Sequence, residues 1–354
     1  MKVNHERLAR LVSHICSAAG TEPALSDQVA AHLVEANLKG HDSHGVGMLP
    51  AYIHNIRAGH LKPNQHATIV RSTGPTLVVD GGFGYGQVVG PEAMRLGIEQ
   101  AKDTGIAVVA LKNAHHLGRI GGHAELVAQA GFISMHYVNV VGHPPQVAPF
   151  GGIEKRLSTN PYCCAIPVQG DHPVVLDMAT SAIAAGKVRV ARNSGNLVPE
   201  ACLIDKDGKE TRDPNEAAAQ LHFGKHKGFG LALVCEMLAG ALTGAWSIQP
   251  GNPREGTIVN HMLTIILDPA VIGDTDQFTS ELKALIAYVK DTAPAPGGTG
   301  VMIPGEPERI ADAERRHLGI DIDDTSWNQI LATAASVGMD AARTDRILQG
   351  NSMA

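Results

Sequence analysis

Two short stretches rich in histidine hold the side chains of this chain that are best suited to chemistry. Residues 40–47 read GHDSHGVG, and residues 113–123 read NAHHLGRIGGH. Histidine is the side chain whose ordinary pKa lies near neutral pH, so it can give or take a proton under physiological conditions. Each stretch places its imidazoles among glycines at the edge of a predicted helix, where a rigidly held ring stays open to a small ligand. Together the two stretches indicate an enzyme that transfers protons.

Three other interpretations of these histidines are weaker. A metal centre needs several converging ligands, and the chain has no H-E-x-x-H or comparable spacing, so we predict no metal site. Ser43 and His44 are adjacent, but Ser43 lies in no G-x-S-x-G turn, which argues against a hydrolase. A histidine that only caps a helix remains the alternative for either stretch taken alone, because 18 histidines make some clustering expected by chance.

The composition predicts a globular protein of two domains. The chain has 354 residues, of which 44% are apolar and 18% are charged, and this is ample material for more than one hydrophobic core. The net charge of −6 and the aromatic content of 4% argue against a nucleic-acid partner, because such binding usually needs a basic surface and stacking side chains.

The cysteines and the apolar segments predict a cytoplasmic protein. There are five cysteines, an odd number, and neither their spacing nor the adjacent pair Cys163 and Cys164 resembles a disulfide framework or a zinc knuckle. The first residues lack the apolar stretch of a signal peptide, and residues 228–244, the most apolar segment, are too few to span a bilayer. We therefore expect no membrane partner.

Hydrophobic periodicity predicts helices at both ends of the chain and strands in the middle. We expect a helix at residues 4–19 capped by Asn4, and a helix at residues 27–39 capped by Ser26 and ended by Gly40. The expected domains are a helical one, formed by residues 1–75 together with residues 278–354, and a sheet domain formed by residues 76–277. The other expected helices are residues 48–58, 91–103, 116–130, 229–242, 278–290, 307–318, 325–337 and 340–348, and the expected strands are residues 68–70, 76–80, 106–111, 132–138, 162–168, 174–177 and 257–267.

A glycine-rich loop at residues 81–86, GGFGYG, lies between a predicted strand and a predicted helix. That context suits a dinucleotide fingerprint, but the loop does not read G-x-G-x-x-G, and the next predicted strand is not followed by an acidic residue for a ribose hydroxyl. The favoured interpretation is a tight turn that needs positive φ angles.

Six motifs occur in the order found in a known family. They are residues 40–45, residues 113–122, Ser158-Thr159-Asn160-Pro161, residues 176–181 (LDMATS), His226-Lys227-Gly228 and Ile303-Pro304-Gly305-Glu306. With these motifs the chain resembles the malate/L-lactate dehydrogenase-like oxidoreductases over nearly its whole length. Within that family the stretch of residues 37–52 is most similar to the hydroxycarboxylate dehydrogenases.

The resemblance implies a fold distinct from the Rossmann fold. The implied class is α+β, a mixed α/β fold whose NAD(P)-binding domain has a largely antiparallel central sheet and is flanked by a helical domain built from both termini. It also implies a homodimer and a nicotinamide cofactor, with NAD(H) favoured by the similarity to the hydroxycarboxylate dehydrogenases and NADP(H) left open. The implied reaction interconverts 2-oxo acids and 2-hydroxy acids.

The resemblance also implies roles for individual residues. His44 matches the catalytic acid/base, Ser43 is its neighbour, His116 matches a proton acceptor of some members, and Asp177 matches an acidic residue near the catalytic histidine. We expect a carboxylate such as Asp177 to favour the charged imidazole of His44 and so to raise its pKa. The implied cofactor contacts are His44, Gly118, Arg119, Ile120, Val175, Leu176, Asp177, Met178, Ala179, His226, Lys227, Gly228, Asn260, Pro304, Gly305 and Glu306.

The substrate pocket departs from the family pattern at one position. Many members have an arginine where this chain has Met48, and that arginine helps to hold the substrate carboxylate. Arg57 or Arg119 could replace it, or the pocket could be more apolar and accept a bulkier side chain. Asn160 is a further candidate for the pocket, because its amide could orient a ligand oxygen.

Two alternatives to a 2-oxo acid reductase remain open on the sequence. One is a reductase of cyclic imines such as piperideine-2-carboxylate or pyrroline-2-carboxylate, which other members of the family reduce. The other is a catalytically silent homologue that only binds a ligand, although Ser43, His44 and Asp177 are all present.

Overall fold

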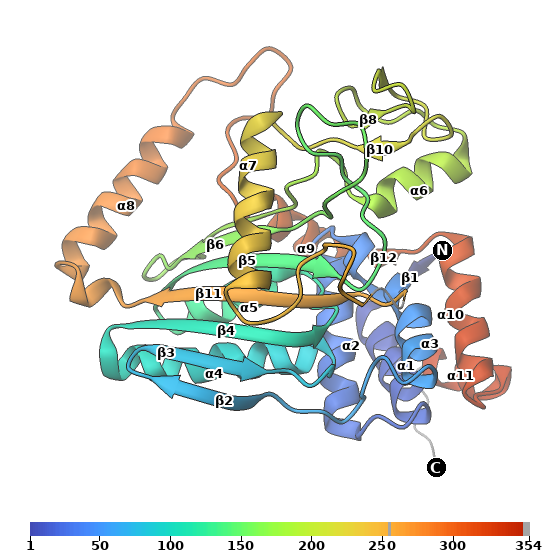
Figure 1. The fold of residues 1–354 in the computed structure, drawn as a ribbon. Helices are drawn as coiled ribbons and strands as arrows, with labels where there is room; N and C mark the ends of the chain where they lie inside the picture. The colour runs from blue at the N-terminus through green and yellow to red at the C-terminus, as the bar shows by residue number, and fades with distance from the viewer. Residues whose placement is uncertain (254–255, 350–354) are drawn as a thin grey trace.

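The computed structural model describes residues 1–253 and 256–349 and is built around a seven-stranded sheet (Figure 1). Only the neighbours β3 and β4 are parallel, and every other pair of adjacent strands is antiparallel. The predicted mixed α/β class with a largely antiparallel sheet is confirmed. In spatial order the strands are β2 (Thr68–Thr73), β3 (Thr76–Asp80), β4 (Ile106–His115), β11 (Val259–Leu267), β5 (Ile133–Val141), β6 (Tyr162–Ile166) and β7 (Val174–Met178).

Helices cover both faces of this sheet. On one face, α4 (Gly86–Thr104) and α5 (Ile120–Gln129) pack against β4, β5 and β6 around a core of small and branched apolar side chains. On the other face, α7 (His226–Cys235) continues into a π-helical segment at Glu236–Ala241 that contacts β5 and β11, and Figure 1 shows the two as one rod above the sheet.

The helices of the two chain ends form a single unit. A common hydrophobic core joins residues from both ends, and β1 (Lys2–Val3) pairs antiparallel with β12 (Ile320–Asp321). Figure 1 shows the blue and red helices side by side at one end of the sheet. A helical unit built from both termini is therefore confirmed; its helices are α1 (His5–Ala18), α2 (Pro23–Leu38), α3 (Leu49–Arg57), α10 (Asp324–Ser336) and α11 (Ala341–Gln349).

The exact domain boundaries stay a prediction. The strand β2, which the predicted boundary assigns to the helical unit, pairs with β3 in the large sheet. Of the C-terminal helices, α9 (Glu306–Leu318) contacts α2, whereas α8 (Thr275–Lys290) has no buried residue and stands apart from the helical unit in Figure 1.

A small lobe that the sequence did not predict lies beyond β7. Its helix α6 (Ala185–Ser194) packs on a core of its own next to a three-stranded sheet. The helix is short and lies between Ala184 and Gly195, so its periodicity is too brief to stand out from a loop. The strands of this sheet are β8 (Leu203–Ile204), β9 (Glu210–Thr211) and β10 (Ala219–Gln220).

Local sequence signals placed some helix starts well and others wrongly. The Asn4 side chain caps α1 by accepting hydrogen bonds from the amides of Glu6 and Arg7, as predicted. In contrast, α2 begins at Pro23 and not after Ser26, because a proline at the first helical position already has the required φ angle.

The start of α4 corrects a second expectation. The helix begins at Gly86, so Pro91 lies inside it and not in its first turn. Proline has no amide proton to donate to the carbonyl of residue 87. The Gln87 carbonyl instead accepts a hydrogen bond of 2.8 Å from the Gln28 side chain, which ties α4 to α2.

Buried histidines make the stability of the fold dependent on pH. Burial lowers the pKa of His115, His136 and His261 to about 3. Between pH 6.5 and 3 these histidines therefore bind protons in the unfolded chain but not in the folded chain, so the free energy of unfolding decreases as the pH falls. Each histidine contributes at most about 1.4 kcal/mol per pH unit. Thermal unfolding followed by circular dichroism should show the melting temperature falling steadily from pH 6.5 to pH 5.

The same measurement between pH 7 and pH 8 is the control, because these imidazoles are neutral there in both states. A melting temperature that stays constant from pH 7 to pH 5 would contradict the burial of neutral histidines.

Candidate active site

His44 lies on a single turn of 3-10 helix, η1 (Asp42–His44), between α2 and α3. Gly40, with a φ angle of +81°, ends α2 as predicted and turns the chain. The Asn37 side chain then holds the turn closed, since its Nδ2 donates to Asp42 (2.6 Å) and its Oδ1 accepts from the Val46 amide (2.8 Å). A Cβ on Gly45 would lie 2.1 Å from the Asn37 oxygen, so this close contact requires glycine.

The helix α9, from the other end of the chain, holds η1 from outside. The Arg315 guanidinium donates to both carboxylate oxygens of Asp42 (2.7 and 3.1 Å) and to the Asn37 carbonyl. On the same helix, the Glu308 carboxylate lies 3.2 Å from His41 Nε2, within hydrogen-bond distance. Polar contacts from both chain ends therefore fix the backbone that carries His44.

The imidazole of His44 is held at one nitrogen and open at the other. Its Nδ1 lies 3.0 Å from the Ser43 hydroxyl, which can donate to or accept from a ring nitrogen. Its ring stacks on that of His116, with centroids 5.5 Å apart and planes 18° apart. Within the described chain, His44 Nε2 has no hydrogen-bond partner, and the half-buried side chain is therefore open to a ligand at this atom.

His116 follows directly on β4 and is oriented by buried neighbours. Gln87 Nε2 donates to the Tyr52 hydroxyl oxygen (2.9 Å), so the Tyr52 proton is free to point at His116 Nδ1, 2.7 Å away. Burial, with repulsion from His44, holds the pKa of His116 well below its usual value. His116 is therefore neutral, with its proton on Nε2.

The glycine-rich loop at residues 81–86, whose context suited a dinucleotide fingerprint, leads into a helix start that packs against the backbone of His116. Gly82 and Phe83 have φ angles of +55° and +62°, so the predicted turn with positive φ is confirmed. At Gly86 the start of α4 touches the backbone after β4, and a Cβ there would lie 2.3 Å from the His116 carbonyl oxygen. The loop thus allows the close contact between α4 and the His116 backbone.

Asp177 and Arg119 lie on the sheet side of the two histidines. The Asp177 carboxylate, near the end of β7, accepts a hydrogen bond of 2.7 Å from the Gly121 amide in the first turn of α5. Arg119 is 3% exposed, and its guanidinium donates to both oxygens of Glu125 (2.6 and 3.3 Å). Lys39 also pairs with Glu125. Both terminal nitrogens of Arg119 are thus engaged by an internal ion pair, while its buried Nε has no hydrogen-bond partner in the described chain.

The electrostatics of His44 correct the expectation that it is charged. Burial is the largest influence and lowers the pKa of His44 to about 4. Asp177 acts in the expected direction and raises this pKa, but Arg119 and His41 lower it further. Desolvation therefore outweighs the carboxylate, and the imidazole is neutral at pH 7.

Most of the residues predicted for the cofactor lie on four neighbouring pieces of backbone. Val175, Leu176, Asp177 and Met178 lie on β7, the last strand of the sheet, and Ala179 follows it. Pro304 and Gly305 lie alongside, because the Val175 amide donates to the Pro304 carbonyl (3.0 Å). Glu306 begins α9 and accepts from the Ile303 amide (2.9 Å). Gly118 and Ile120 flank Arg119 at the start of α5.

The fourth piece is the first turn of α7. His226 and Lys227 are exposed there, and the preceding Gly224 and Lys225 both have positive φ angles, of +54° and +58°. Gly228 packs tightly, since a Cβ on it would lie 2.2 Å from the Phe223 carbonyl oxygen. The Lys227 and Gly228 amides donate to carbonyls of this turn, so the exposed Lys227 side chain is the group here that suits an anion.

Four predicted residues are engaged elsewhere. Asn160 is fully buried, and its amide bonds to Val140, Ala232 and Glu236, with no atom left for a ligand. Asn260 is likewise buried between the Leu117 amide and the Asn139 carbonyl. Met48 packs against the helical core. Arg57 is exposed and donates to the Ser336 carbonyl.

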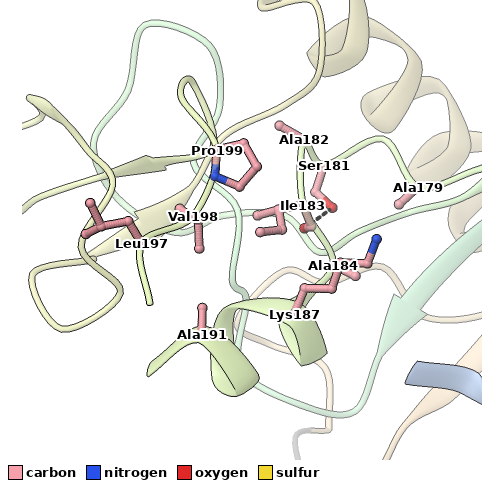
Figure 2. Close-up of a pocket in the computed structure, with 10 residues that line it drawn as sticks. All are labelled: Ala179, Ser181, Ala182, Ile183, Ala184, Lys187, Ala191, Leu197, Val198 and Pro199. Carbon is pink, nitrogen blue, oxygen red and sulfur yellow. Dashed lines mark hydrogen bonds between the residues drawn. The ribbon is translucent and has the colours of Figure 1, made fainter. Parts of the chain in front are cut away.

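A cavity of 390 Å³ lies between the chain leaving β7 and helix α6, and none of its ten described lining residues is a histidine (Figure 2). Its wall reaches the histidine turn, because an ideal Cβ on Gly186 would lie 3.2 Å from Ser43 Cβ. Lys187 follows Gly186 and lines the cavity. The sequence did not reveal Lys187, Tyr52 or Gln87 as site residues. The only sequence signal for Lys187 is the Gly-Lys pair after a strand, which is weak. Tyr52 and Gln87 are identified only by their long-range contacts.

In residues 1–253 and 256–349 there is no group of three histidine, cysteine, aspartate or glutamate side chains placed to hold a metal ion. Among the helices of the same residues, none combines the length and the apolar character that crossing a membrane requires.

The contact between Gly86 and His116 yields a stability test. In Gly86→Ala the new methyl group meets backbone that cannot rotate away, so we expect a loss of about 1–3 kcal/mol in the free energy of unfolding. Gly230→Ala is the matched control: this helical glycine has nothing within 4 Å of an added Cβ, and the change should stabilise by up to about 1 kcal/mol. Urea unfolding measures both, and equal stabilities would refute the contact.

Comparison with known proteins agrees with this architecture. The family model described as malate/L-lactate dehydrogenase matches residues 3–331. The chain is 44% identical over 327 residues to hydroxycarboxylate dehydrogenase B of Escherichia coli K12, covering 90% of each chain. It is 38% identical over 345 residues to L-lactate dehydrogenase of Cupriavidus necator, covering 96% of this chain and 99% of the relative. A solved structure from E. coli, described provisionally as a malate/lactate dehydrogenase, matches with a TM-score of 0.95 at 40% identity over 99% of each chain. The chain therefore belongs to the malate/L-lactate dehydrogenase family, whose named members here are oxidoreductases of hydroxy acids.

Proposed function

We propose that this protein is an NAD(P)H-dependent oxidoreductase that interconverts 2-oxo acids and 2-hydroxy acids. One observation supports the proposal above the others: a neutral histidine, His44, has its Nε2 unpartnered in the described chain, and its neighbour Ser43 lies against Gly186, beside the wall of a cavity of 390 Å³. Its ring is backed by Ser43, His116 and Asp177. This arrangement suits proton transfer to or from a small ligand.

The residues around β7 fit a nicotinamide dinucleotide. Leu176 is 37% exposed on the last strand of the sheet, so an apolar face is free for a ring system. The exposed Lys227 at the start of α7 suits a pyrophosphate, because its ammonium group can pair with the phosphate charge. When bound, the cofactor would supply the hydride of the reaction. NAD(H) is the first candidate because of the similarity to hydroxycarboxylate dehydrogenases, and NADP(H) the second.

His44 would handle the proton in both directions. In oxidation, its neutral Nε2 takes the proton of the substrate hydroxyl, and the charged ring that results is favoured by Asp177. In reduction, the protonated ring gives this proton to the carbonyl oxygen as the carbonyl carbon receives the hydride, so the negative charge on oxygen never builds up fully. Ser43 supports both states, because its hydroxyl can accept from or donate to Nδ1. His116 offers a second N–H to the same oxygen.

The assembly is a proposal that follows from the resemblance, and the compartment is one that follows from the cysteines and the apolar segments of the sequence. The partner in solution would be a second copy of the chain, and the protein would act on small molecules in the cytoplasm without nucleic acid or membrane.

The assignment of His44 leads to a first test. In His44→Ala the proton donor is lost, so turnover of 2-oxo acids should fall about a hundredfold or more, while the affinity for NADH changes little. A panel of 2-oxo acids with NADH and with NADPH, read at 340 nm, measures turnover, and fluorescence titration measures cofactor affinity. His54→Ala, an exposed histidine on α3, is the control. Near-normal turnover in His44→Ala would overturn the role.

The low pKa of His44 leads to a second test, in the direction of oxidation. Since only the neutral ring can take the proton, kcat/KM for a 2-hydroxy acid should fall tenfold per pH unit only as the pH approaches the pKa of about 4. From pH 7 to pH 5 the profile should therefore be flat, whereas an ordinary histidine would lose activity below pH 6.5. Samples returned to pH 7 control for unfolding. An acid limb centred near pH 6.5 would show that burial does not govern this group.

A further inference from the structure

The substrate carboxylate needs a cation, and the two arginines expected from the sequence are occupied. Arg119 is bound to both oxygens of Glu125 inside the protein, with 2% of its side chain exposed. Arg57 lies on the outer side of α3 and donates to the Ser336 carbonyl at the end of α10. Met48 itself is neutral. The charge that fixes the carboxylate must therefore come from another part of the chain.

We propose that Lys187 binds the substrate carboxylate in the cavity between residues 179–184 and α6. Among the ten described residues that line this cavity, Lys187 alone carries a charge. In the described chain its ammonium group has neither an ion pair nor a hydrogen bond. Figure 2 shows the side chain running along the cavity toward Ala179 and not away from it.

Lys187 is connected to His44 through Gly186 and Ser43, and a 2-oxo acid would have to reach both side chains. The carbonyl and the carboxylate of such a substrate are on adjacent carbons, so the proton donor and the cation must flank one small volume. Gly186, the residue before Lys187, packs against Ser43 with 3.2 Å between Ser43 Cβ and an ideal Cβ. The Ser43 hydroxyl in turn contacts the His44 ring. The flexible four-carbon stem of a lysine can cover the remaining gap.

The rest of the cavity wall indicates which side chain the substrate carries. Ile183, Val198 and Pro199 present apolar surface, and the Ser181 hydroxyl is already bonded to the Ile183 carbonyl (2.9 Å). A second carboxylate on the substrate would find no second cation among the lining residues. The site therefore suits a monocarboxylic 2-oxo acid with an apolar side chain.

This inference rests on the proposed function, and a matched pair of substrates tests it. The probes are phenylpyruvate and its ethyl ester, which has the same carbonyl but no carboxylate charge. In Lys187→Met, the KM for phenylpyruvate should rise about 10- to 100-fold, because a charge-assisted hydrogen bond is lost. The kcat/KM for the ester and the affinity for NADH should stay within about threefold. Lys187→Arg should restore most of the affinity for the acid, because it keeps the charge.

Lys209→Met, at an exposed lysine in the turn between β8 and β9, is the control for removal of a charge in the same lobe. A parallel loss for acid and ester in Lys187→Met would mean a merely structural role, and an unchanged KM would mean no contact. Either result overturns the proposal.

A binding measurement separates this proposal from the proposed function. If the wild-type protein oxidises neither NADH nor NADPH with any 2-oxo acid, the proposed function fails. Calorimetric titration of phenylpyruvate in the presence of NAD⁺ then still decides the role of Lys187. Binding that is lost in Lys187→Met and kept in Lys209→Met supports the carboxylate site, and binding that is equal in both variants, or absent from the wild type, refutes it.

Discussion

The bidentate contact between Arg315 and Asp42 is the constraint on which the candidate site depends. It joins a helix near the C-terminus to the turn that carries His44, and the same guanidinium also donates to the Asn37 carbonyl at the end of α2. Charge-assisted hydrogen bonds of this paired geometry fix direction as well as distance. Asn37 closes the turn from inside, so the His44 backbone is fixed on both sides. The sheet then needs only to present His116 and Asp177 against an imidazole that is already in place.

Desolvation governs the chemistry of this region more than the nearest charges do. Asp177 favours a charged His44, yet the ring is neutral because it has lost most of its water. His116 and His115 behave in the same way. A site rich in imidazoles thereby avoids the repulsion of several positive charges, and it keeps a proton acceptor ready at neutral pH. The positive charge that an anionic substrate needs is then supplied from outside the cluster, on the flexible side chain of Lys187.

The sequence predicted the parts of the fold that depend on local pattern. The Asn4 cap, the end of α2 at Gly40 and the positive φ angle at Gly82 all follow from residues within a few positions, and all are confirmed. The start of α4 was wrong, because the Gln28 side chain, far away in the chain, compensates for Pro91. At the site, the motif around His44 was visible, whereas the supporting Tyr52 and Gln87 were not, since their hydrogen bonds join segments separated by more than thirty residues. The roles assigned to His44, Ser43, His116 and Asp177 stay predictions.

The shared core of the two chain ends has a consequence for how the molecule is made. Domains form during synthesis as their segments leave the ribosome, N-terminal parts first. The helices α1, α2 and α3 are released early, but their apolar surface is completed by α10 and α11, and the first strand pairs with residues Ile320–Asp321. The apolar surface of these helices therefore stays partly uncovered while the residues of the sheet are synthesised. A product that ended before α9 would contain every residue of the histidine motif, yet it would lack Glu308 and Arg315, which contact the turn that carries His44.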